Sequence, residues 1–223
     1  MIAGGGVAAA DPVNVQNVDQ YVTTVDGYSL HATLTGLPGT VTATINPVAN
    51  MAATAFSREG FLSGLATETI EVLTSASLKN VEKATLRLWV QFGCQVDLRG
   101  GALTGMTGGN ELGLPFSIAN IFGSGGNIPV AGVTSPAESL NPSILGTVRP
   151  GNIYRAELAH KDFDATTAGA RPVPNQFHIA VRDTQVKVDG CGGPVAVRMI
   201  ATAWMSTETS DDWVNAYSDI VEL

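Results

Sequence analysis

Apolar and polar residues alternate with a period of two along much of the chain, which predicts β-strands that each bury one face. The clearest alternation covers residues 84–96, where the apolar face is made by Ala84, Leu86, Leu88, Val90, Phe92, Cys94 and Val96. Similar patterns predict strands over 28–34, 41–45, 68–73, 153–158, 177–188 and 195–203. Many short strands, frequent turn signals and no long helical pattern predict an all-β fold built on a β-sandwich.

The segments between these strands carry local signals of their own. Residues 36–39, with a Pro-Gly pair, predict a hairpin joining 28–34 to 41–45, and residues 189–194 predict a tight turn between 177–188 and 195–203. Ser57 is a candidate cap for a short helix, which Gly60 and Gly64 would keep short.

Two further segments look polar and irregular. Residues 161–175 are interpreted as a polar loop, and Asp211 and Asp212 as the start of a polar tail.

One stretch, residues 100–137, differs from the rest of the chain. It contains a single charged residue, Glu111, and ten of the 25 glycines. Apolar and small residues alternate over 112–119, residues 123–126 form a Gly-rich turn signal, and a second apolar run covers 128–133. This pattern predicts a β-hairpin with its core at 112–133, whose first arm residues 103–109 would extend. A hairpin packed on the rest of the domain, or a Gly-rich surface loop, is the alternative.

The sequence therefore predicts three parts. Residues 1–10 are a signal-peptide remnant or a disordered N-terminus, residues 11–99 plus 138–223 are the β-sandwich, and residues 100–137 are the inserted hairpin. An open sheet edge is not tolerated in lipid, so a membrane-spanning hairpin requires several chains that close one barrel together.

Composition narrows the function classes. Charged residues make up 14% of the chain and the net charge is −8, so no basic patch is available to neutralise nucleic-acid phosphates. No apolar run reaches 18 residues, so no transmembrane helix is predicted. The small residues that end in Ala8-Ala9-Ala10 resemble the tail of a secretory signal peptide, which indicates export.

The two cysteines, Cys94 and Cys191, fit one disulfide in an exported protein, with two separate buried thiols as the alternative. With only three scattered histidines, no metal-ligand spacing is present and no metal is expected. Asp211-Asp212 is interpreted as a solvated pair, and His31, His160 and His178 as surface residues. Hydrolase and phosphate-loop motifs are absent, so neither an enzyme nor a cofactor is expected.

Four segments, in order, resemble the MspA-type porins of mycolic-acid-containing actinobacteria. They are Ser57–Gly64 (S-R-E-G-F-L-S-G), Leu88–Gly93 (L-W-V-Q-F-G), Pro150–Leu158 (P-G-N-I-Y-R-A-E-L) and Gly192–Thr202 (G-G-P-V-A-V-R-M-I-A-T). The resemblance implies a homo-octamer in which each chain supplies a β-sandwich rim and one long hairpin, and the hairpins close a 16-stranded barrel. It also implies passive diffusion of ions and small hydrophilic solutes across the mycolate outer membrane.

The chain departs from that family pattern at three points. The region that matches the hairpin tip, 120–127, has no acidic residue, whereas the best-known pores carry adjacent aspartates there. The spacing between Phe92 and Pro150 is longer than usual, and the cysteines are not part of the pattern. A strong cation preference from a ring of tip charges is therefore not implied.

The hairpin supplies the candidate functional residues. The predicted pore-lining residues are Ser117, Ala119, Asn120, Ser124 and Asn127, and the predicted mouth charges are Glu111 and Glu138. The predicted lipid-facing residues are Leu112, Leu114, Phe116, Ile118, Ile128 and Val130. A register shift of one residue would exchange the two faces. Trp89 and Tyr154 are either aromatic anchors at the membrane interface or packed strand residues.

Two other interpretations remain open. The first is a hetero-oligomeric porin in which a paralogous subunit supplies the missing charge. The second is a secreted or wall-associated β-sandwich that binds a ligand or protein and never inserts into a membrane.

Overall fold

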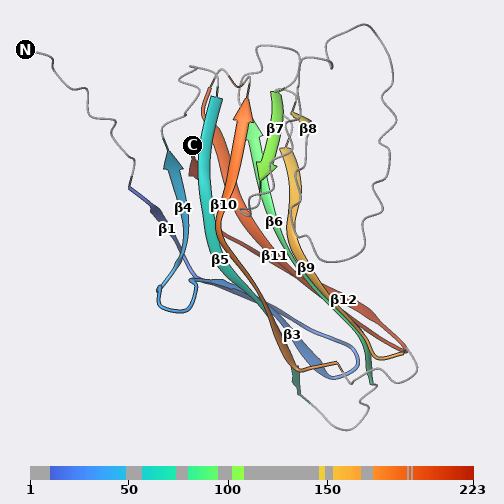
Figure 1. Cartoon of the computed structure of the whole chain (residues 1–223). Coiled ribbons are helices and arrows are strands. Elements are labelled where there is room, and N and C mark those ends of the chain that lie inside the picture. The colour runs from blue at the N-terminus through green and yellow to red at the C-terminus, as the bar shows by residue number, and fades with distance from the viewer. Residues whose placement is uncertain are drawn as a thin grey trace, which may run out of the picture.

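The computed structural model describes residues 11–48, 57–73, 80–94, 102–107, 146–148, 153–166, 173–189, 191 and 193–223. These residues contain thirteen β-strands in two sheets (Figure 1). The large sheet comprises β1 (Val13–Val15), β2 (Val18–Thr23), β3 (Tyr28–Thr35), β4 (Ala43–Val48), β5 (Ser57–Val72), β7 (Ala102–Thr107), β8 (Gly146–Val148) and β10 (Gln176–Asp189). The small sheet comprises β6 (Val81–Cys94), β9 (Ile153–Asp164), β11 (Val195–Thr207), β12 (Asp211–Tyr217) and β13 (Val221–Glu222). The all-β class is confirmed.

The large sheet is organised around β5. Strand β10 pairs along one edge of β5, and the other edge is shared by β4 and β3. Both β3 and β4 run antiparallel to β5, so they point the same way and lie end to end. The predicted hairpin of 28–34 with 41–45 is therefore wrong: the turn at Gly36–Gly39 carries the chain along β5 and does not reverse it.

The helix suggested at Ser57 is also wrong, because Ser57 begins β5. Gly60 and Gly64 do not limit a helix: they allow close packing within the strand. A Cβ atom at Gly64 would lie 3.2 Å from the Cβ atom of Ala43, and one at Gly60 would lie 2.7 Å from a methyl group of Leu223. Glycine within a strand commonly marks such an approach.

The small sheet has the order β12-β11-β6-β9. Strand β6 realises the clearest predicted alternation: Leu86, Leu88 and Val90 are fully buried in the core between the sheets. The expected pairing of 177–188 with 195–203 is wrong, because β10 belongs to the large sheet and β11 pairs with β6 and β12 in the small one. The turn between them passes from one layer to the other.

Two segments interpreted as irregular also contain strand. Strand β9 continues to Asp164, into the predicted polar loop, and β12 begins at Asp211, at the start of the predicted tail. Their charged residues face solvent on one side of an edge strand, so polar composition did not distinguish them from loops.

At one end of the sandwich a polar cluster joins the two sheets. Asp26, in the turn before β3, accepts hydrogen bonds from the hydroxyl groups of Thr207 at 2.5 Å, Thr209 at 2.7 Å and Ser210 at 2.9 Å. Thr207 is the last residue of β11, and Thr209 and Ser210 lie in the turn between β11 and β12. These hydrogen bonds satisfy the largely buried carboxylate of Asp26. They also connect the turn before β3 in the large sheet to the end of β11 in the small sheet.

A second acidic residue, Glu68, is buried without such partners. It lies on β5 between Ala32 of β3 and Phe177 of β10, and it is 0% exposed. Burial raises the pKa of its carboxyl group to about 9, and the backbone of Trp204 on β11 lowers it only in part. Neither carboxyl oxygen has a hydrogen-bond partner of good geometry among the described residues. Glu68 is therefore neutral at pH 7.

This burial predicts that stability falls as the pH rises. A carboxyl group with a folded pKa near 9 and an ordinary value of 4.5 holds its proton better in the folded state. Its contribution is complete below about pH 4.5 and is lost as the pH approaches 9, at roughly 1.4 kcal/mol per pH unit. We expect Glu68→Gln to abolish this slope, as measured by urea unfolding at a series of pH values.

Glu71→Gln is the matched control, because Glu71 lies on the same strand with an exposed side chain. It should keep the slope of the wild-type protein. An equal slope in the Glu68→Gln variant would show that another group dominates the pH dependence.

Candidate functional site at the root of an insertion

The chain between β6 and β9 leaves and re-enters the small sheet at one place. Strand β6 ends at Cys94, strand β9 begins at Ile153, and Gly93 is paired directly with Ile153. Residues 95–152 are therefore an insertion between two adjacent antiparallel strands. The paired ends of β6 and β9, together with the neighbouring ends of β5 and β10, are called the root of the insertion.

Both ends of the insertion contain paired strand. Strand β7 pairs with the last five residues of β10, and β8 pairs antiparallel with β7, with Ala102 opposite Val148 and Thr104 opposite Gly146 (Figure 1). The two ends thus form a short ribbon at the edge of the large sheet. Strand β7 overlaps residues 103–109, which are predicted to extend the first arm of the hairpin, and it pairs with β10 in the large sheet.

The predicted pore residues lie outside the described residues. These are Glu111, Leu112, Leu114, Phe116, Ser117, Ile118, Ala119, Asn120, Ser124, Asn127, Ile128, Val130 and Glu138. Their assignment to the lumen, the mouth or the lipid therefore stays a prediction.

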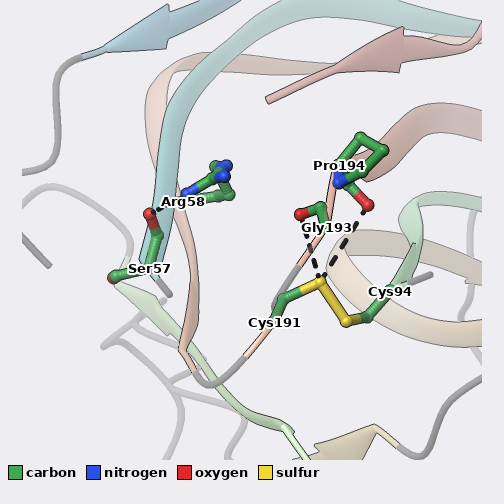
Figure 2. The surroundings of a disulfide bond; sticks show 6 residues. All are labelled: Ser57, Arg58, Cys94, Cys191, Gly193 and Pro194. Carbon is green, nitrogen blue, oxygen red and sulfur yellow. Dashed lines mark hydrogen bonds between the residues drawn. A yellow bond between two sulfur atoms is a disulfide. The ribbon is translucent and has the colours of Figure 1, made fainter. Parts of the chain in front are cut away.

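A disulfide at the root joins the end of β6 to the connection between the two sheets. Cys94 and Cys191 are bonded with an S–S distance of 2.05 Å and a Cα–Cα distance of 5.8 Å, as predicted from the cysteine count (Figure 2). Cys94 is the last residue before the insertion, and Cys191 lies where the chain passes from β10 to β11. Both are buried. The sulfur atom of Cys191 contacts the carbonyl oxygens of Gly193 at 3.5 Å and Pro194 at 3.9 Å.

Polar pairs hold β5 against β10 beside this disulfide. The Ser57 hydroxyl donates to the Asp189 carboxylate, and the Gln185 side-chain amide donates to the Glu59 carboxylate. Within β10, the Lys187 ammonium lies 3.3 Å from the Asp189 carboxylate. Arg58 donates to the carbonyl oxygen of Ser57 at 3.0 Å (Figure 2). The polar positions of the S-R-E-G-F-L-S-G segment thus fix the strand that faces the start of the insertion.

The other candidates are dispersed over separate surfaces. His31 lies near Asp19, His178 contacts Thr67 at 2.9 Å, and His160 contacts Glu157 at 2.6 Å. No group of three or more metal-binding side chains is found within the described part of the chain. In that part no helix is long and apolar enough to cross a membrane.

Trp89 and Tyr154 differ in their surroundings. The Tyr154 ring packs on Phe92 of the core at 5.1 Å between ring centroids, which fits the packed-residue interpretation. Trp89 lies on the outer face of the small sheet, where the Arg155 guanidinium sits 4.2 Å from its ring centroid. A hollow of about 680 Å³ lies at the opposite end of the sandwich beside Tyr28, Ile70 and Val81.

Sequence reasoning missed Glu68 and the β5–β10 pairs at the root. The signal was present: Leu62, Gly64, Ala66, Glu68 and Ile70 continue one face at a period of two. A strand is predicted only from residue 68, and Ser57 is interpreted as the cap of a short helix, so the first half of this face is missed.

The fold is an all-β sandwich with a long insertion between two neighbouring strands, β6 and β9. The family model described as MspA matches residues 13–222, so the chain belongs to the MspA family of porins. The resemblance found in the sequence is thereby confirmed. No curated protein matches the chain significantly.

The disulfide is expected to carry a measurable part of the stability. Closing a loop with a sequence separation of 97 residues restricts the unfolded chain, by roughly 4–5 kcal/mol in the chain-entropy model. The double variant Cys94→Ser/Cys191→Ser should lower the midpoint of urea unfolding accordingly. Wild-type protein treated with a reductant should match the variant, and a midpoint unchanged from the oxidised protein would contradict the prediction.

Proposed function

We propose that the chain is the subunit of an outer-membrane porin, a water-filled channel for passive diffusion of ions and small hydrophilic solutes across a mycolate outer membrane. The observation that carries the proposal is the root of the insertion in a chain of the MspA family. The insertion begins and ends as the paired strands β7 and β8 at the edge of the large sheet, and its residues 100–137 contain a single charge. The family supports an outer-membrane location, and the small-residue run before Asp11 suggests export through a signal peptide.

The proposed assembly is a homo-octamer with a 16-stranded barrel. The part of residues 100–137 that follows β7 supplies one membrane-spanning hairpin per chain, and the sandwich, which includes β7, forms the rim. A single hairpin in lipid would leave two edges unpaired, and hairpins from neighbouring subunits satisfy them. The partners are thus copies of the same chain, outer-membrane lipids and the transported solutes. No enzymatic activity and no cofactor belong to this function.

The proposed lumen is uncharged at its narrowest part. Ser117, Ala119, Asn120, Ser124 and Asn127 line it, and Glu111 and Glu138 give a weaker negative field at the mouth. The alternating apolar residues from Leu112 to Ile118, with Ile128 and Val130, face lipid. A paralogous subunit that brings acidic residues to the tip is the hetero-oligomeric form of the same proposal.

Planar-bilayer recording tests the proposal and the lumen assignment together. The detergent-extracted protein should give stable unit steps with weak selectivity for cations in a salt gradient. Asn120→Asp adds a ring of acids to the tip and should raise the cation-over-anion permeability ratio on the order of tenfold.

Gln20→Glu is the control, because it adds the same charge on exposed β2 of the rim. It should leave the reversal potential near that of the wild-type protein. If the Asn120→Asp channel has the selectivity of the wild-type channel, the assignment of Asn120 to the lumen is contradicted. Folded protein that gives no steps would contradict the homomeric pore.

A further inference from the structure

The outer face of the small sheet next to the root carries three ordered rows of side chains. Cross-strand pairing places Ile153, Gly93 and Ala196 in the first row. The second row holds Arg155, Gln91 and Arg198, and the third holds Glu157, Trp89, Ile200 and Tyr217. We call these rows the root face.

The first row forms a hollow. Gly93 and Ala196 have almost no side chain, and a concavity of about 130 Å³ opens over them. It is flanked by Ile153, which is 68% exposed, and Ile220, which is 62% exposed. Two exposed isoleucines beside a small hollow are typical of a surface that receives an apolar side chain from a partner.

In the second and third rows, arginine side chains are held in place by contacts with aromatic rings. Arg155 lies over the Trp89 ring, and Arg198 lies 4.6 Å from the centroid of Tyr217 and donates to Gln91 at 2.6 Å. Ile200 is fully buried beneath them although it points away from the core between the sheets. Arginine, tryptophan and tyrosine held in fixed positions are the residues that dominate protein interfaces, because little side-chain entropy is lost on binding.

The position of the root face in the fold indicates which partner binds to it. Strands of one barrel lie about 4.8 Å apart, so hairpins of neighbouring subunits can pair only when their roots come close together. The root face borders Cys94 and Ile153, where the insertion leaves and re-enters. The chain has 20 acidic and 12 basic residues, so a second copy offers these arginines more carboxylates than basic groups.

We infer that the root face is the contact surface for the neighbouring copy of this chain in the assembled pore. The inference rests on the proposed porin function and adds the surface through which copies recognise each other. In a closed ring this contact is heterologous: the root face of one subunit meets a different surface of the next.

The test places charge on the rim of the hollow. Ile153→Asp/Ile220→Asp changes two exposed side chains, so the fold of the single subunit should be retained. The matched control, Val25→Asp/Val72→Asp, adds the same charge at residues that are 84% and 60% exposed at the opposite end of the sandwich. Each full-length protein is extracted in the same mild detergent, and its mass is followed against concentration by light scattering.

We expect the root-face variant to need about tenfold or more protein for half-assembly, and the control to stay within about twofold of the wild type. Unchanged assembly in both variants would overturn the inference and leave the porin proposal standing. Equal loss in both would overturn it too, since added charge alone would then be the cause.

Two further outcomes separate the alternatives. Normal assembly of the root-face variant with weaker binding to anionic lipid vesicles would assign the face to lipid and overturn the inference. A wild-type protein that is folded, monomeric at every concentration and silent in bilayers would instead refute the porin proposal on which the inference rests.

Discussion

Every backbone amide and carbonyl group along a strand edge must find a partner, and this constraint governs the arrangement of the molecule. Within the sandwich, both edges of β5 are paired: one edge bonds to β3 and β4, and the other bonds to β10. At the root, β7 pairs with β10 and β8 pairs with β7, so the large sheet is extended there. The hairpin that we propose beyond them would leave two edges without a partner in one sandwich, and the proposed assembly would satisfy those edges.

The root needs cross-links because two sheets and an insertion meet there. The disulfide joins the last residue of β6 to the segment that leads into β11, and the polar pairs of Ser57 and Glu59 fix β5 to β10. The opposite end is closed by the hydroxyl groups around Asp26, which resist separation of the turns.

The core between these ends is less uniform than its apolar pattern indicates. Glu68 occupies an inward position and is tolerated because it remains protonated, while Gly64 lets Ala43 approach closely. The outer face of the small sheet carries a buried isoleucine of its own, Ile200. Apolar burial on both faces distinguishes this sheet from a simple sandwich layer with one solvated side.

Local patterns determined much of what was predicted from the sequence. The two-residue period predicted β6 and the all-β class, because the pleat alone sets that period. Two cysteines in a chain expected to be exported indicated one disulfide, and four ordered motifs indicated the family. Only the tertiary structure decided which strands pair: β3 follows β4 along β5, β10 and β11 lie in different layers, and Ser57 begins a strand. A strand has the same period whatever its partner, so pairing depends on contacts between residues far apart in the chain, and those contacts are absent from any local pattern.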